Sequence, residues 1–557
     1  MSFNDLFRKK SATQALKQED LPGEHVSLNK VLRVRDLTFF GIAAIIGAGS
    51  FSSMGDACFN GGPGVVFLFI MCAVACGFTA MCYAEFASRV PASGSAYTYA
   101  YVSFGELFAW IIGWALLMEY SIGNIYVAFS WSGYFTNLLD GVGVHMPAYL
   151  TTNYTSAHEA FLNNTTGEGM NAWNTAPLIG GLHIIFDLPA VCINAVITWL
   201  VYVGVKESRN FSNAMVITKL IIIALVIVVG LFYVDIENWT PFMPNGFGGV
   251  MKGVAAVFFA YIGFDAVSTL AEESENPQTD LPRGMINSLV ICTVIYIILS
   301  FVLTGMVSYN KLGVSDPLAE VFNLKGVKWM LFTVSIAAVV AMTSVLLVFQ
   351  MGQPRIWMSM SRDGLLPKRF SSIHPKYKTP AFSTIITGLV VGIPILFTDE
   401  KFVLDFTSIA TLFAFALVCG GVLMLPRREE SVSKLHKKFS LPYINGKWII
   451  PAATLISFAL VSYFIPGFIT NNFNINKETA ASTIPMLVFF VLCITMAILS
   501  FLKDLSLIPV LGLLSCSFLL TGMSASNWIW FFSWLAAGLV IYFAYSFKNS
   551  KLNNSSR

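Results

Sequence analysis

Fourteen apolar segments divide this chain, and their length constrains its fold more than any other feature. Most approach or exceed the roughly 20 residues that an α-helix needs to cross a hydrocarbon core of about 30 Å. Lipid offers no hydrogen-bond partners, so each segment must close its own backbone hydrogen bonds, as helices do. The sequence therefore predicts an all-α polytopic membrane protein with about 14 transmembrane helices. The segments are approximately 37–57, 63–88, 103–135, 186–204, 211–234, 249–271, 284–308, 329–352, 381–399, 402–425, 448–468, 484–501, 505–522 and 527–546.

Composition and motifs exclude several other classes of protein. Only 12% of the residues are charged, about half the share in soluble domains, and the net charge of +3 gives no reason to expect a nucleic-acid partner. The nine cysteines lie in or beside apolar segments without metal-type spacing, so neither a metal site nor a disulfide framework is expected. The spans contain no HExxH pair and the chain no phosphate-binding GxxxxGK[ST] loop, so we expect no enzyme and no cofactor.

The positive charges predict the orientation of the chain. If the spans alternate in direction, 27 of the 34 lysines and arginines fall on the side that carries both termini. Cytoplasmic loops carry this excess, so both termini are predicted to be cytoplasmic. The first 36 residues are polar and mixed in charge, and we expect no cleavable signal peptide there.

Two spans carry features that an ordinary membrane helix avoids. The first contains GIAAIIGAGSF, in which Gly41, Gly47 and Gly49 stand in an otherwise apolar stretch. Close helix packing is one interpretation of these glycines, and an interrupted helix is the other. The sixth span has Gly263 in its middle beside Asp265, a carboxylate that costs about 2.5–3.5 kcal/mol at membrane depth unless it faces a cavity or a partner.

Spans one and six hold corresponding places if spans 1–5 and 6–10 form a five-plus-five inverted repeat. Paired interruptions at such places indicate the central site of a transporter. Backbone N–H groups at the start of one half-helix suit a carboxylate, and carbonyl groups at the end of another suit an ammonium. The broken helices 1 and 6 therefore match the zwitterion of an amino acid.

Four motifs, met in order, carry a family resemblance. GIAAIIGAGSF, YAEFASRVPASGSAYTYAY, FFAYIGFDAVSTLAEE and SRDGLLPKRFSSIHPKYKTP together resemble the amino acid–polyamine–organocation superfamily, most closely its cationic amino acid transporter branch and bacterial relatives of that branch. The likeness covers about 30–425 and resumes in the last two spans. It implies the five-plus-five fold, with the substrate held between spans one and six.

The resemblance also implies which residues bind the substrate. The Ile45 carbonyl is expected to accept the substrate ammonium, and the N–H groups of Ala48 and Gly49 to hold its carboxylate. This sequence has Ala48 where the family often has Ser or Thr, and Ser50 where an aliphatic residue is usual. Backbone recognition survives both departures. The expected substrate-binding residues are Ile45, Gly47, Ala48, Gly49, Phe259, Ala260, Tyr261 and Ile262.

Three ionisable residues inside the spans are candidates for proton coupling. Lys219 lies too deep in span five to reach the interface easily, and the resemblance puts its ammonium where related transporters bind sodium. Its alternative role is structural, as a cation that ties span five to the break in span one. Glu119 in span three either makes a structural contact or meets a proton or substrate, and Lys219 either pairs with Glu119 or Asp265 or leaves both free. Without an evident unpaired deep carboxylate, we expect small and medium amino acids rather than strictly arginine or lysine.

These observations predict a domain organisation and a function. We expect a secondary active transporter that takes up amino acids across the plasma (inner) membrane by alternating access, driven by a proton gradient. An exchanger or a transporter selective for cationic amino acids is the alternative, and a channel or intramembrane enzyme is a distant one. The lipid bilayer and the amino acid are the expected partners, and a monomer the expected state. The predicted parts are a cytoplasmic segment 1–36, a transport core 37–425, a cytoplasmic loop 426–447, accessory helices 448–546 and a tail 547–557.

Overall fold

Helices make up nearly all of the fold. The structure, a computed structural model, describes residues 6–11, 32–47, 49–92, 94–204, 208–314, 316–377, 379–425, 439–464 and 480–554. Within these ranges, eight helical stretches are long and apolar enough to cross a membrane, and four further apolar helices have 10–17 residues. The predicted all-α membrane fold is confirmed.

Every predicted segment coincides with a helix or with a group of short helices. The first span comprises α2 (Val34–Ile45), η3 (Gly49–Ser53) and α3 (Met54–Gly61), and the sixth comprises α11 (Gly246–Lys252), α12 (Val254–Phe259) and η7 (Asp265–Glu273). The five-plus-five repeat itself stays a prediction. The other spans are α4 (Val65–Arg89), α6 (Glu106–Gly141), α9 (Leu188–Val203), α10 (Ser208–Leu231), α13 (Pro277–Met306), α15 (Lys328–Arg362), α16 (Ala381–Ile395), α17 (Glu400–Met424), α19 (Ile449–Phe464), α21 (Ala480–Lys503), α22 (Leu507–Leu520) and α23 (Ala525–Ile541).

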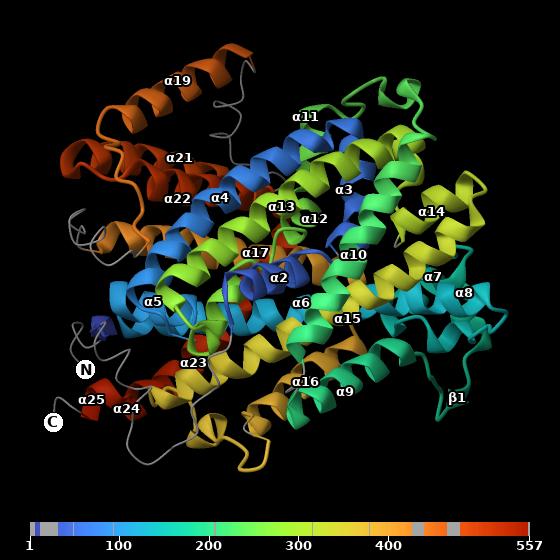
Figure 1. The fold of residues 1–557 in the computed structure, drawn as a ribbon, viewed down its shortest axis with the longest axis horizontal. Helices are drawn as coiled ribbons and strands as arrows, with labels where there is room; N and C mark the ends of the chain where they lie inside the picture. The colour runs from blue at the N-terminus through green and yellow to red at the C-terminus, as the bar shows by residue number, and fades with distance from the viewer. Residues whose placement is uncertain are drawn as a thin grey trace.

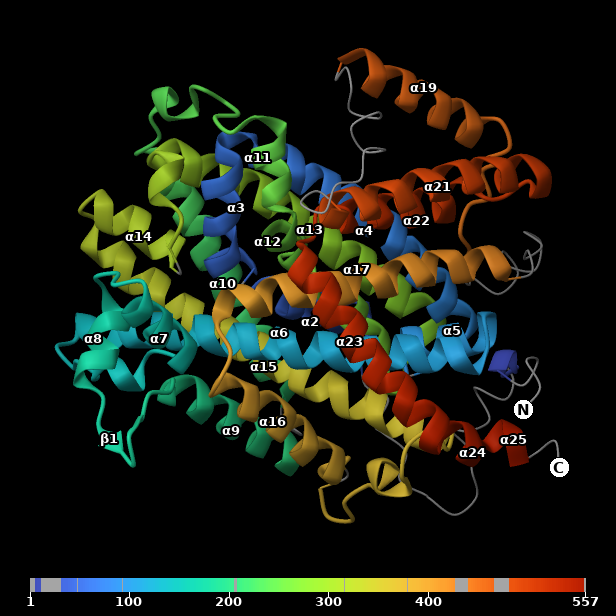
Figure 2. The ribbon, with the colours of Figure 1, turned by 180° about the vertical axis from the view of Figure 1, so that it is seen from behind.

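The two described ends of the chain lie at the same end of the bundle (Figures 1 and 2). We call this end the terminal face. The opposite face carries α7 (Tyr154–Leu162), α8 (Glu168–Thr175) and α14 (Pro317–Leu324). A chain that crosses the membrane an even number of times begins and ends on the same side, as the two described ends do here. The remaining short elements are η4 (Gly62–Gly64), α5 (Ala96–Ser103), η5 (Ala148–Leu150), η6 (Ile236–Trp239), η8 (Tyr309–Lys311), η9 (Lys368–Ser371), η10 (Tyr542–Ser546), α24 (Phe547–Asn549) and α25 (Lys551–Asn554).

The long helices α6 and α15 pack along each other through the centre, and α2 packs between α13, α10 and α15. The accessory helix α19 contacts α21 at the periphery (Figure 2). With 36 residues, α6 is about 54 Å long at 1.5 Å per residue, so it extends beyond the membrane. The predicted segment 103–135 therefore ends too early, because helix formation continues through polar residues that the hydropathy pattern leaves out.

A small hairpin on the opposite face was not predicted from the sequence. The strands β1 (Leu178–Ile179) and β2 (Leu182–His183) pair antiparallel, with Leu178 opposite His183. Gly180 and Gly181 join them with φ values of +61° and +84°. Positive φ at both central residues defines the turn that suits a two-residue hairpin, and glycine adopts it without strain. The two glycines were the available signal.

The Asp316 carboxylate ties α14 to the end of α6, because the Asn137 side chain donates a hydrogen bond to it (2.7 Å). Burial, and then the nearby Glu320, raises the pKa of Asp316 to about 6 from its usual 3.8. The Asp316 carboxyl group therefore binds its proton more tightly in the folded protein than in the unfolded chain. Its contribution to stability is complete below about pH 4 and is lost as the pH rises through about 6.

We expect Asp316→Asn to weaken this pH dependence. Between pH 5 and pH 7.5, the free energy of unfolding of the variant should rise by about 1 kcal/mol relative to that of the wild type. One pKa unit corresponds to about 1.4 kcal/mol, and the effect is reduced because the site is only partly buried. Thermal unfolding of the purified protein at several pH values measures this difference. Asp235→Asn is the control, because Asp235 is exposed and lies in a different loop. An identical pH profile for wild type and Asp316→Asn would contradict the assignment.

Candidate functional site

The first span is interrupted between Ile45 and Gly49. Ile46 takes an extended conformation (φ −82°, ψ 101°), so the chain leaves the helical path there. It resumes around the Gly47 carbonyl, which accepts hydrogen bonds from the N–H groups of Ser50 and Phe51 and from the Ser50 hydroxyl, each at 3.0 Å. A π-helical turn then leads into α3. Ala48, one of the predicted carboxylate-binding residues, lies outside the described residues.

The sixth span is interrupted between Phe259 and Asp265. The chain turns non-helically through Ala260 and Gly263, and Gly263 has a φ of +117°, which favours glycine strongly. The Gly263 carbonyl accepts from the Ala266 N–H (3.1 Å) as the chain enters the 3₁₀-helix η7. Both predicted interruptions are thus present.

The two interruptions touch each other. A Cβ atom on Gly49 would lie closer than 3.0 Å to the Ala260 Cα, and one on Gly263 would lie 2.7 Å from the Ala44 Cβ. Elsewhere in the first span, Gly41 packs as closely against Ser288 of α13. The glycines therefore serve both of the roles considered for them: Gly41 allows close helix packing, and Gly49 and Gly263 let two interrupted backbones meet.

Lys219 reaches the interruption of span one from α10. Its ammonium, fully buried, donates to the carbonyl oxygens of Ala43 (3.0 Å) and Ile46 (2.6 Å) and to the Ser344 hydroxyl (3.1 Å). An ammonium has three donors, so its hydrogen-bonding capacity is filled. The last carbonyls of a helix lack partners and carry the negative end of its dipole, so a cation stabilises them. Lys219 thus occupies the expected place at the break.

The described structure shows no ion pair between Lys219 and Asp265 or Glu119. The possibility that Lys219 neutralises one of these carboxylates is therefore wrong for this conformation. Lys219 contacts backbone carbonyls instead because the interruption of α2 exposes them, which the sequence pattern could not specify.

Asp265 and Glu119 form a buried pair of carboxyl groups. Their exposed fractions are 1% and 2%, and they are close enough for their charges to interact. Within the described part of the chain, both Asp265 oxygens and one Glu119 oxygen lack a hydrogen-bond partner, as do the hydroxyls of Tyr83 and Tyr120. Asp265 is buried rather than facing lipid, as predicted. The sequence left open whether either carboxyl group has a basic partner, because this depends on how spans distant in sequence pack. The expected preference for small and medium amino acids stays a prediction.

Apart from Ala48, which lies outside the described residues, the predicted substrate-binding residues lie at the paired breaks, with two differences. The Ile45 carbonyl already accepts a hydrogen bond from the Tyr296 hydroxyl (2.8 Å), although a carbonyl can accept a second. Tyr261 points its hydroxyl at the Phe69 carbonyl (3.0 Å), so its side chain packs against α4 rather than between the breaks. Phe259 packs edge-on against Tyr126 of α6 (4.6 Å between ring centroids).

Two carboxylates near the terminal face join neighbouring elements. Glu273 of η7 forms an ion pair with Arg355 of α15. Glu85 of α4 accepts from Arg89 (2.6 Å) and from the N–H of Leu441 (2.7 Å), which fixes the segment before α19. Both carboxylates therefore link elements at the terminal face.

Three hydroxyl groups that hold the interruptions were not predicted from the sequence. Ser344 accepts from Lys219, Tyr296 donates to Ile45, and Ser53 donates to the carbonyls of Gly49 and Ala256 (both 3.0 Å). Each is a polar residue within an apolar span. A polar residue within an apolar span can indicate a contact of this kind. Serine and tyrosine are common in membrane helices, however, so their presence alone does not identify these three.

Comparison with known proteins agrees with this geometry. A family model described as "Amino acid permease" matches residues 32–492, and one described as "C-terminus of AA_permease" matches residues 505–550. The chain belongs to the amino acid permease family. This result confirms the resemblance to the amino acid–polyamine–organocation superfamily. The permease is a transporter rather than an enzyme, as its family and its relatives are.

Three relatives cover most of this permease. The branched-chain amino acid permease BcaP of Bacillus subtilis (strain 168) is 37% identical over 550 residues, which cover 98% of this chain and 99% of the relative. The methylthioribose transporter of the same organism is 35% identical over 551 residues, covering 99% and 100%. Cationic amino acid transporter 4 of Homo sapiens is 30% identical over 585 residues, covering 95% and 88%.

The packing around the breaks predicts different outcomes for two glycine substitutions. Gly49→Ala should lower uptake of labelled amino acids at least tenfold, because its Cβ meets the backbone of Ala260, which cannot move aside. Gly47→Ala should be milder, because its Cβ meets only the side chain of Val345, and Val345→Ala should partly restore uptake. The control is Gly77→Ala, whose Cβ meets nothing within 4 Å. Equal uptake by the Gly49 and Gly77 variants would contradict the packing argument.

Proposed function

We propose that this permease is a secondary active transporter that takes up amino acids by alternating access, coupled to protons. We further propose that it resides in the plasma membrane with both termini in the cytoplasm. The observation that carries the proposal is the meeting of two interrupted helices beside the ammonium of Lys219.

The paired breaks supply the groups that an amino acid backbone needs. The Ile45 carbonyl at the end of α2 can accept a second hydrogen bond, from an ammonium, and N–H groups that follow the break suit a carboxylate. Both features come from the main chain, so they would bind any amino acid in the same way. Side-chain selectivity must then come from the residues around the breaks.

Lys219 supports proton rather than sodium coupling. Its ammonium binds two carbonyls and a hydroxyl, oxygen atoms that a cation such as sodium could otherwise use, and a fixed positive charge there disfavours a second cation. Burial disfavours the charged amine, whereas the helix end and the carbonyls favour it. A change in water access during transport alters this balance, so the amine can bind a proton facing one side and release it on the other. Asp265 and Glu119 are further proton-carrying candidates, since they are buried as a pair.

Neutral amino acids are the first candidate substrates. One full-length relative is named as a branched-chain amino acid permease, and nothing in the paired breaks requires a cationic side chain. Cationic amino acids are the second candidate, since the Asp265 and Glu119 carboxyl groups lack a basic partner in the described part of the chain and other relatives are named as cationic transporters.

The experiment that separates these possibilities is uptake into proteoliposomes with labelled alanine, leucine, arginine and lysine. We expect leucine and alanine to accumulate when the outside is made acidic, and to accumulate far less without a pH gradient. Accumulation of arginine and lysine alone would favour the cationic alternative. Uptake that needs an amino acid inside the vesicles, and no pH gradient, would favour an exchanger.

Replacement of Lys219 tests the coupling directly. Lys219→Met keeps most of the length of the side chain, one atom short, but removes the ammonium and its three donors. We therefore expect substrate binding to persist and accumulation driven by a pH gradient to fall at least tenfold. The matched control is Lys325→Met, because Lys325 is exposed on the opposite face. Wild-type accumulation with unchanged pH dependence in Lys219→Met would leave Lys219 with a structural role only.

A further inference from the structure

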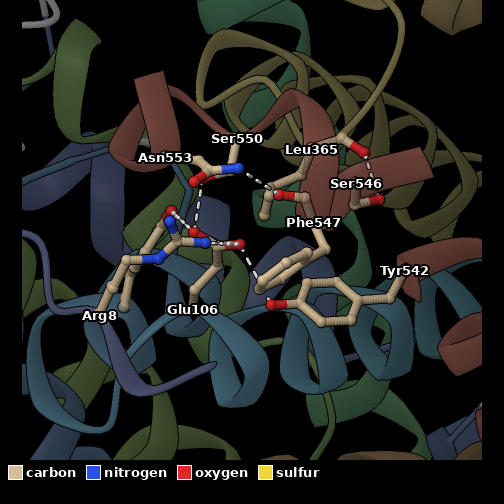
Figure 3. A network of polar contacts seen from close by, with 9 residues as sticks. Arg8, Glu106, Leu365, Tyr542, Ser546, Phe547, Ser550 and Asn553 are labelled. Atoms are coloured by element: carbon tan, nitrogen blue, oxygen red, sulfur yellow. Dashed lines mark hydrogen bonds and ion pairs between the residues drawn. The ribbon is translucent and has the colours of Figure 1, made fainter. Parts of the chain in front are cut away.

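A network of polar contacts joins both ends of the chain to the terminal face (Figure 3). At its centre lies Glu106, the fully buried first residue of α6. Its carboxylate accepts hydrogen bonds from the hydroxyls of Tyr101 (3.0 Å), Tyr542 (3.1 Å) and Ser550 (2.5 Å), and Arg8 forms an ion pair with it (3.6 Å). One carboxylate thus holds the N-terminal arm, α5, η10 and the C-terminal tail.

Asp363, just after α15, is a second point where both termini meet. Its carboxylate pairs with the Lys10 ammonium (2.8 Å) and accepts from the Tyr97 hydroxyl (2.7 Å). Its backbone carbonyl accepts from the N–H of Lys551 (3.1 Å). Two residues further on, the Leu365 carbonyl accepts from the Ser546 hydroxyl (2.6 Å). We call residues 8–10, Glu106, 363–365 and 546–551 the terminal clasp.

The backbone of the clasp is closely fitted. Gly105 has a φ of +107°, and a Cβ there would lie 2.6 Å from the Phe7 carbonyl carbon. Gly364 has a φ of +84°, and a Cβ there would lie closer than 3.0 Å to the Asn549 carbonyl oxygen. Each glycine therefore makes room for one terminus. The backbone of residues 6–11 and that of the C-terminal tail thus pack directly against the backbone at Gly105 and Gly364.

The clasp fixes α5 against the interrupted sixth span. The hydroxyls of Tyr97 and Tyr101 join α5 to the two carboxylates of the clasp. Directly before α5, Ser95 accepts a hydrogen bond from the Ser268 hydroxyl of η7 (2.7 Å). Ser95 and Ser268 are both fully buried. The clasp and the Ser95–Ser268 hydrogen bond thus lie on the same element, so a separation of α5 from η7 is resisted by both.

We propose that the terminal clasp is a closing device, and that release of the C-terminal tail lets the terminal face open toward the breaks. The N-terminal arm, residues 6–11, is built for reversible contact, since Nε and Nη2 of the partly buried Arg8 guanidinium make no hydrogen bond in the described structure, and Nη2 meets Glu106 through the ion pair alone. When water reaches the Arg8 guanidinium, these nitrogens form hydrogen bonds with it. The free energy gained in this way offsets part of the free energy lost when the clasp contacts break. The C-terminal tail covers Glu106. When the tail is released, the buried Glu106 carboxylate loses the hydrogen bonds from Ser550 and Tyr542.

The proposal is tested by the reactivity of a cysteine at the α5–η7 contact. The reporter is Ser268→Cys, in a protein whose exposed Cys192 is replaced by serine. Its reaction with a small maleimide is followed in nanodiscs, so the measurement needs no transport and stands apart from the proposed function. We expect the reaction to be at least fivefold faster in a chain ending after Tyr545, and two- to threefold faster in Ser550→Ala and Tyr542→Phe.

Three controls separate opening from general loosening. A chain ending after Asn554 and the Ser517→Ala variant, whose hydroxyl bonds only within its own helix, should react at the reference rate. A second reporter, Ser130→Cys, is equally buried but closer to the opposite face and should not change in any variant. Unchanged Ser268→Cys reactivity in the folded Ser550→Ala and Tyr542→Phe variants overturns the proposal, even if the truncated chain fails to fold. Equal acceleration at both reporters also overturns it, since that shows a structural role only.

Discussion

A break in a membrane helix leaves backbone carbonyls without partners in a medium that offers none, and the rest of this structure follows from how that is solved. The Lys219 ammonium reaches across from α10 and satisfies two carbonyls at the end of α2. The Ser344 hydroxyl of α15 takes its third donor. One cation therefore holds spans one, five and eight together at the point where the backbone is exposed. Charge-assisted hydrogen bonds of this kind contribute more than neutral ones, so the Lys219 ammonium stabilises the exposed carbonyls strongly.

The second constraint is the contact between the two breaks. Interrupted backbones can exchange polar contacts with a ligand only if no side chain separates them. Gly49 against Ala260 and Gly263 against Ala44 provide this closeness. The Tyr296 and Ser53 hydroxyls then hold carbonyls on each side of the gap. The site is thus assembled from main-chain groups, and side chains from neighbouring spans fix their positions.

Further polar contacts link the region of the breaks to the terminal face. Glu273 and Arg355 join η7 to α15, and the Ser95–Ser268 hydrogen bond joins α5 to η7. The terminal clasp lies one layer further out and ties α5 to the start of α6 and the end of α15. A movement at the breaks that separates η7 from α5 must therefore act on contacts made by both ends of the chain. This geometry couples the termini, far away in sequence, to the centre of the protein.

The sequence by itself determined the class of fold, the order and approximate positions of the spans, and the two interrupted helices, although α15 runs ten residues past the predicted end at 352. Those features are local: apolar runs of sufficient length must be helical in lipid, and glycines beside a buried Asp265 stand out in such runs. The candidate site at Ile45–Gly49 and Phe259–Ile262 followed from them and from the family resemblance. Only the tertiary structure decided that Lys219 bonds to carbonyls and pairs with neither Asp265 nor Glu119, because this depends on how α10 packs against α2. It also decided that Glu106 meets the C-terminal tail, since residues more than 400 positions apart come together only when the whole bundle has formed.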